Sequence, residues 1–227
     1  MTPTSTAENR RFLGYFLVGV IISIIMFVGF SKNFYLRAWI GTRPITSMVH
    51  VHGLVMTAWI MLFLTQTILV ANGRANLHRK LGVAGAFLAF VVVTLGIYTI
   101  SNSILRQSPD ANLQSFAPLF VAFDGLSLLL FAGLVITALG MRLRAQTHKR
   151  LMLMALVSLM PPAYGRFVAY FTRVDVFEIV LGLMCTTVAM CVMIDTIRHR
   201  RLHPALVWSG ALVVAVNLLT YLAQSAE

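Results

Sequence analysis

Seven long apolar runs dominate the chain and restrict what it can fold into. They cover roughly residues 12–31, 48–71, 80–101, 117–141, 150–171, 176–197 and 205–223. A helix needs about 20 mostly apolar residues to cross the hydrocarbon core of a bilayer, and these runs satisfy that length. The segments between them are short and carry turn-forming residues such as Asn72-Gly73 and Ser108-Pro109-Asp110. The sequence therefore predicts an all-α membrane protein with seven transmembrane helices.

The composition agrees with lipid as the main solvent of the surface. Of the 227 residues, 59% are hydrophobic and 11% are charged, and the mean hydropathy is +0.84. A soluble domain carries about 25% charged residues, so a water-soluble fold of this length could not hide so much apolar side chain. The formal charge of +11 lies in short clusters between the apolar runs, which indicates contact with anionic lipid headgroups and not with nucleic acid.

The distribution of Lys and Arg indicates how the helices are oriented. If the N-terminus is cytoplasmic, the cytoplasmic segments hold twelve of the 18 basic residues, the outer segments hold five, and Arg166 lies within the membrane. Cytoplasmic loops are the ones enriched in Lys and Arg. We therefore expect a multi-pass protein of a bacterial cytoplasmic (inner) membrane, N-in and C-out. Its parts would be a cytoplasmic tail (1–11), a transmembrane domain (12–223) and an extracytoplasmic tail (224–227).

An internal repeat is visible in the expected cytoplasmic loops, each of which has a basic stretch that ends in a histidine. The three copies are Arg74-Ala75-Asn76-Leu77-His78, Arg144-Ala145-Gln146-Thr147-His148 and Arg200-Arg201-Leu202-His203. About 25 residues before each histidine, near the outer end of the preceding helix, lies a polar residue: His52, Asp124 and Glu178 respectively. This periodicity predicts one helix followed by three helical-hairpin repeats.

Two charged residues fall inside predicted helices at about the same depth: Asp124 in the fourth and Arg166 in the fifth. A lone charge at that depth costs at least ~2.5 kcal/mol, so we expect the two side chains to pair. Pro161-Pro162, just inward of Arg166, should kink the helix because proline lacks an amide donor. The pair is either structural, beside a kink, or part of a polar cavity open to the outer face.

A second cluster lies at the outer end of the second predicted helix. Met48, His52 and Met56 share one helix face there, and His50 is adjacent. Imidazole and thioether form a plausible copper(I) site, and Asp124 with Glu178 would extend it to a set suited to zinc or iron. The alternatives are an interfacial histidine packed among methionines and a group that handles protons.

The histidines of the repeated loops form a third cluster. His78 and His148 occupy equivalent positions, with His203 as a third, so the repeat could place two imidazoles across the helix bundle. Axial histidines from facing helices can hold the iron of haem b. The alternative is interfacial histidines beside basic loops. His50 or His52 cannot share one iron with His78, because ~35 Å of helix separates them.

Three runs resemble motifs of known membrane-protein families. His148-Lys149-Arg150-Leu151-Met152-Leu153-Met154-Ala155 resembles a signature of the YozB-like (CtaM-like) family. His78-Arg79-Lys80-Leu81-Gly82 and His50-Val51-His52-Gly53 resemble motifs of related, uncharacterised multi-helix proteins. The resemblance implies a role in the assembly of haem–copper cytochrome oxidases, with oxidase or other respiratory-chain subunits as partners and His148 and His78 as functional residues. The chain departs from that family in having seven predicted helices and not about four.

Together these features favour a non-catalytic or redox accessory protein of the respiratory membrane that binds haem b, copper, zinc or iron through histidines. The alternative is a transporter or channel for a small solute or proton, with Asp124 and Arg166 at its substrate site. An enzyme with His50, His52, Asp124 and Glu178 around a metal is the least favoured class, because no known ligand spacing is matched.

Overall fold

The computed structural model describes the backbone of residues 6–41, 45–105, 111–171 and 176–225, and the side chains of residues 15–41, 45–102, 121–171, 176–223 and 225. Most of the described chain is helical, and it contains no strand. The five basic residues of the expected outer segments include Arg43, Arg106 and Arg173, and these three lie outside the described part.

The helices follow one another with short connections. They are α1 (Thr6–Phe30), the π-helical turn η1 (Ser31–Tyr35), α2 (Arg37–Ile40), α3 (Ser47–Ala71), α4 (Ala75–Leu105), α5 (Ala111–Gly140), α6 (Ala145–Ser158), α7 (Pro161–Phe171), α8 (Val176–His199) and α9 (Pro204–Ser225). Six of these have the length and apolarity to cross a membrane, and the bent pair α6–α7 makes a seventh if it counts as one span. The protein is therefore an integral membrane protein of helical type.

Several helices extend beyond the apolar runs from which they were predicted. α1 begins at Thr6, inside the expected cytoplasmic tail, and α4 covers residues 75–105 where the apolar run covers 80–101. A helix satisfies its backbone hydrogen bonds internally, so nothing requires it to stop where the hydrocarbon core ends. The hydropathy of the sequence therefore predicts which part of a helix lies in lipid, but it does not predict where the helix begins and ends.

The bend expected at Pro161-Pro162 is present. α6 and α7 meet at 42° across a break at Leu159 and Met160, whose amides donate to carbonyls three residues back at 3.3 and 3.0 Å. Pro161 then opens α7, which is the helix position where a missing amide donor does no harm. The expected fifth helix is thus two helices joined by one tight turn.

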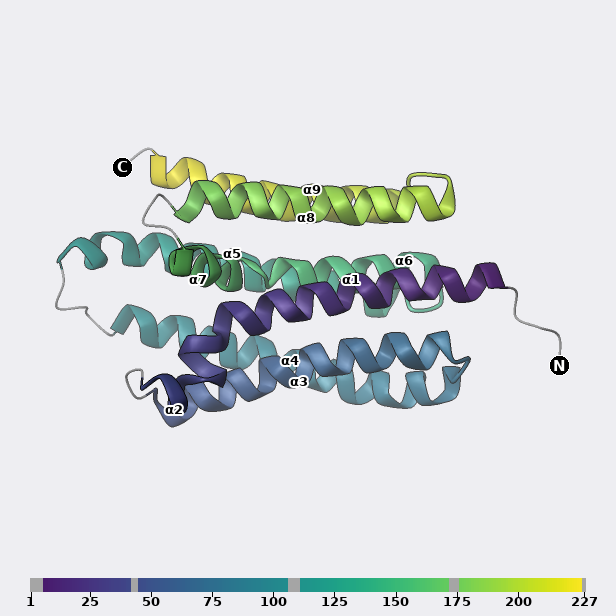
Figure 1. The fold of residues 1–227 in the computed structure, drawn as a ribbon, viewed down its shortest axis with the longest axis horizontal. Coiled ribbons are helices and arrows are strands. Elements are labelled where there is room, and N and C mark those ends of the chain that lie inside the picture. Colours follow the sequence, from purple (N-terminus) through teal and green to yellow (C-terminus); the bar gives the residue numbers. More distant parts are fainter. Residues whose placement is uncertain (1–5, 42–44, 106–110, 172–175, 226–227) are drawn as a thin grey trace.

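The bundle has α8 and α9 along one side, α3 and α4 along the other, and α1, α5, α6 and α7 between them (Figure 1). α6 packs against α5 and α9, while α7 packs against α1 and α8. α6 is the most enclosed helix, since almost every side chain from Arg150 to Ser158 is buried. Large apolar side chains face outward elsewhere, including Phe87, which is 70% exposed, as expected for a surface in contact with lipid.

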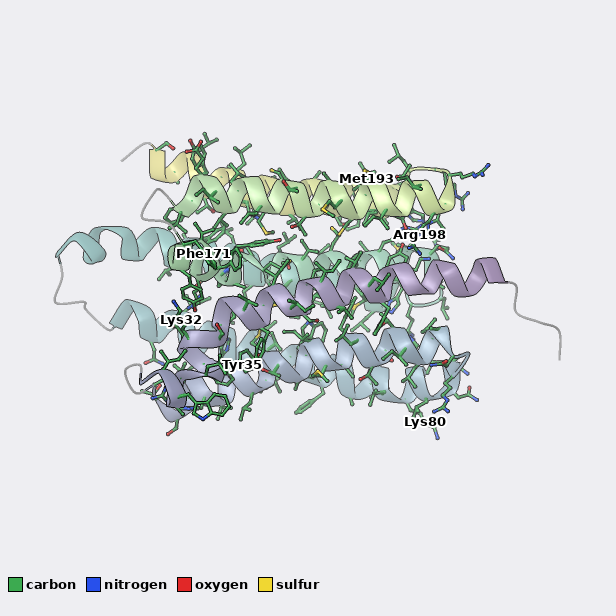
Figure 2. All side chains as sticks on the ribbon, in the orientation of Figure 1. Lys32, Tyr35, Lys80, Phe171, Met193 and Arg198 are labelled. Atoms are coloured by element: carbon green, nitrogen blue, oxygen red, sulfur yellow. The ribbon has the colours of Figure 1, made fainter. Side chains whose placement is uncertain are left out.

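The two ends of the bundle differ in charge. The start of α1 and the turns that follow α3, α5 and α8 all lie at one end (Figure 1). We call this the basic end, because the three repeated basic loops lie there. Lys80 and Arg198 lie at this end, whereas Lys32, Tyr35 and Phe171 lie at the other (Figure 2). We call the latter the opposite end.

Candidate functional site

His78 and His148 come together at the basic end. Each lies in the first turn of its helix, α4 or α6, and the centres of the two rings are 6.3 Å apart with the planes at 84°. Nδ1 of His148 is 2.8 Å from the carbonyl oxygen of Ala138, so Nδ1 carries the proton and donates it. The Nε2 atom of His148 then keeps its lone pair, which is the form that binds a metal.

Two further polar atoms beside this histidine pair are buried and have no hydrogen-bond partner among the described residues. They are Nδ1 of His78 and Oε1 of Gln66. The His78 ring also approaches the backbone of Gln66 in α3. Gly82 leaves room next to this amide, since a Cβ placed there would be 3.8 Å from Nε2 of Gln66. The histidine pair therefore has a polar neighbour from a third helix.

A buried charge network lies next to the histidine pair, on the same end of α6. Arg150 is 1% exposed and Asp195, in α8, is 3% exposed, and Nε of Arg150 donates to Oδ2 of Asp195 at 2.9 Å. The hydroxyl of Tyr15, in α1, donates to Oδ1 of the same carboxylate. Arg150 also donates from Nη1 to the main-chain and side-chain oxygens of Gln146 at 2.6 and 3.0 Å. The network joins α1, α6 and α8.

The sequence analysis missed this network. Arg150 is one of the twelve basic residues counted above in the cytoplasmic segments, and that count gives no sign that its side chain is buried among helices. Neither Asp195 nor Tyr15 was singled out. The sequence does contain a signal for Asp195. It is an acidic residue inside the apolar run 176–197, so a buried partner can be expected for it for the same reason as for Asp124.

His199 and Lys149 connect the network to the surface of the basic end. Nδ1 of His199 is 2.9 Å from the backbone oxygen of Asp195 and 3.1 Å from its Oδ1, so this nitrogen is the donor. Nζ of Lys149 is 3.5 Å from Nε2 of His199 and lies 4.6 Å above the ring of Tyr15. Lysine can only donate, so Nε2 of His199 accepts.

His203, the third histidine of the repeat, does not join His78 and His148. Its Nδ1 accepts a hydrogen bond from the amide of Ala205 at 3.2 Å, which caps the start of α9. Burial lowers the pKa of His203, and the positive charge of nearby Arg150 lowers this pKa further. The role visible here is that of a helix cap.

Asp124 and Arg166 lie within electrostatic range of each other at the opposite end. Among the described residues, however, the ion pairs shorter than 4.0 Å are those of Asp195 with Arg150 and His199. Arg166 instead donates to the carbonyl of Pro162 at 2.8 Å and lies 4.6 Å above the ring of Phe30. Pro162 lies in the first turn of α7, four residues before Arg166, so this bond lies within α7 and joins the arginine to the proline pair.

The two outer histidines have different surroundings. His50 is exposed, with its Nε2 at 3.3 Å from Nη1 of Arg37 and its Nδ1 at 3.3 Å from the carbonyl of Thr46. His52 is half-buried, close to the charge of Arg166. Glu178 is exposed on α8. The described residues hold no group of three or more His, Cys, Asp or Glu side chains arranged for a metal ion, so the mixed outer site stays a prediction.

The chain matches no family model, no curated protein and no solved structure.

Proposed function

We propose that this integral membrane protein binds haem or a transition-metal ion between His78 and His148 and acts as a redox or assembly accessory of a respiratory membrane. A bacterial inner membrane and contact with oxidase or other respiratory-chain subunits belong to the same proposal. Copper, zinc or iron would be the metal, and haem b the porphyrin.

The separation of the two rings carries the proposal. A metal–nitrogen bond of about 2.0 Å plus roughly 1 Å from nitrogen to ring centre places each centre about 3 Å from the metal. Two imidazoles on opposite sides of one metal then have centres roughly 6 Å apart, and the observed 6.3 Å agrees with this. Haem supplies the remaining donors itself, so it needs only two protein ligands. The bond from His148 to Ala138 is the orienting contact that metal-binding histidines usually have.

Visible spectroscopy and elemental analysis of the purified protein test this proposal. Cells supplied with a haem precursor should yield a protein with a Soret band, and protein incubated with copper, zinc or iron should retain one equivalent after desalting. His78→Ala and His148→Ala should each lose the bound group. His50→Ala, an exposed histidine at the opposite end, is the matched control and should keep it. A colourless protein that retains no metal would refute the proposal, and loss in His52→Ala alone would move the site to the opposite end.

A second function is favoured by the bend between α6 and α7. We propose as the alternative that the protein conducts a small solute or a proton through the region of Asp124 and Arg166. Broken helices often lie at transport sites, and here Arg166 lies in the second turn after the break and bonds to the carbonyl of Pro162. Flux through reconstituted vesicles should fall in Asp124→Asn and in Arg166→Gln. Flux equal to that of vesicles without protein would refute this alternative.

A further inference from the structure

Three residues along one face of α3 share an unusual property. His52, Trp59 and Gln66 each have a buried side-chain atom with no hydrogen-bond partner among the described residues: Nδ1, Nε1 and Oε1 respectively. They are spaced seven residues apart, so they lie on one face of the helix, nearly in line. Nδ1 of His78, in the first turn of the next helix, has the same property at the basic end of this row.

The row faces the inside of the bundle and not the lipid. Trp59 is 2% exposed and packs edge-to-face against Phe131 of α5 at 5.1 Å between ring centres. Gln66 lies beside Gly82 of α4, and His52 lies near the charge of Arg166 in α7. The row thus begins at the Arg166–Asp124 region and ends at His78 and His148.

Other polar side chains of α3 do not share this property. Thr57, Thr65 and Thr67 donate to carbonyls of their own helix at 2.7, 2.8 and 2.7 Å. A polar atom held inside a membrane protein without a partner is costly, so such atoms are normally satisfied by protein or by buried water. Water is the partner that fits an isolated donor or acceptor inside a bundle.

We propose that this face of α3 binds a file of internal water molecules through which protons pass between the Arg166–Asp124 region and the His78–His148 pair. Each step moves a proton along a hydrogen bond, so one proton enters at one end for each that leaves at the other. The proposal rests on the second proposed function, because it names the proton as the conducted species and α3 as the route. It does not require a bound haem or metal.

The length of the row from His52 to Gln66, and the apolar residues within it, indicate slow proton conduction. Fourteen residues of helix cover about 21 Å, a large part of the ~30 Å hydrocarbon core. Apolar core residues such as Met56 and Phe63 lie between the polar positions. Water must enter these apolar gaps before a proton can pass, so we expect conduction well below that of an open channel.

Proton flux into vesicles tests the route. The full chain is reconstituted with an enclosed pH-sensitive dye, and a potassium gradient with valinomycin drives the flux. Trp59→Phe and Gln66→Leu should each lower the flux about tenfold, the change expected when one hydrogen bond of the path is lost. Thr65→Ala is the matched control, because Thr65 is the exposed neighbour of Gln66 on the same helix, and its flux should equal the wild type.

The outcomes separate the route from the function. Flux that depends on Asp124 but is unchanged in Trp59→Phe and Gln66→Leu would overturn the route and leave the second function standing. Wild-type flux no greater than that of empty vesicles would overturn both.

A second measurement does not depend on the stability of those variants. In a background of Cys185→Ala and Cys191→Ala, the single variants Trp59→Cys, Gln66→Cys and Thr65→Cys are each treated with a small water-soluble methanethiosulfonate. Only a thiol in contact with water ionises and reacts. Reaction at both positions, and much slower reaction at position 65, is expected. Equally slow reaction at all three positions would overturn the proposal.

Discussion

Arg150 and Asp195 illustrate how a buried charge is made tolerable. The carboxylate of Asp195 accepts from Arg150, Tyr15 and His199, and Arg150 makes two further bonds to Gln146. Removing both charges from water is expensive, and the cost is offset only when the pair is close and its remaining donors and acceptors are satisfied. Replacing both residues together by apolar ones should therefore change the stability of the protein little. Removing either one alone should lower the stability strongly, because it leaves the other charge buried without a partner.

Arg150→Met should destabilise the protein by about 3–5 kcal/mol, because it leaves the carboxylate of Asp195 buried without its cation. The measurement is thermal or denaturant unfolding in detergent. Arg144→Met, at an exposed position before α6, is the control and should change stability by less than about 0.5 kcal/mol. Arg150→Met with Asp195→Asn should recover part of the loss. Equal stability of Arg150→Met and Arg144→Met would contradict the network.

His203 should make the fold sensitive to acid. Burial and the charge of Arg150 lower its pKa below the ordinary value of 6.5, so the unfolded chain takes up the proton first as the pH falls. Stability is therefore unaffected above that value and decreases below it. Protonation also removes the Nδ1 acceptor that caps α9. His203→Asn keeps a capping oxygen without titrating. Its melting temperature should fall less than that of the wild type on acidification, and parallel curves would contradict the assignment.

At the scale of elements, the crossing of α1 with α7 depends on one missing side chain. A Cβ on Gly29 would collide with the backbone carbonyl of Ala163, the residue that follows Pro161-Pro162. Tyr170, at the other end of α7, donates to the carbonyl of Gly29 at 2.8 Å. Close approach of the two backbones therefore holds the bent helix against α1.

Gly29→Ala should destabilise the protein by about 1–3 kcal/mol, since the added methyl group cannot be accommodated without moving a backbone. Gly182→Ala is the control, because a Cβ at that exposed position of α8 meets nothing within 4 Å. It should be neutral or stabilising by up to about 1 kcal/mol, the gain in helix propensity. Melting temperatures of the two variants decide the matter, and an unchanged Gly29→Ala would rule out the tight crossing.

At the scale of the whole molecule, the ends of the bundle should lie on opposite sides of the membrane. The three basic turns share one end, and loops rich in Lys and Arg are retained in the cytoplasm (Figure 1). Alkaline phosphatase fused after residue 73, 143 or 202 should therefore be inactive, whereas a fusion at the C-terminus should be active. Activity at only one of the first two positions would contradict both the orientation and the helix arrangement.

The presence of six or seven helices able to span a membrane, the bend at Pro161-Pro162 and the proximity of His78 to His148 could be predicted from the sequence. The first two depend on local properties: the length of an apolar run, and a ring that removes an amide donor. The proximity of the two histidines could be predicted because two basic loops repeat the same sequence pattern. Loops of similar sequence that connect similar helices place their histidines at similar depth.

Tertiary structure alone decided which polar groups meet across the bundle. Tyr15, Arg150 and Asp195 come from three distant parts of the sequence, and Arg166 lies over Phe30 without forming a close ion pair with Asp124. The physical reason is that these helices are apolar on every side. Depth in the membrane can be read from residue number, but the direction in which each helix face points depends on how the helices pack.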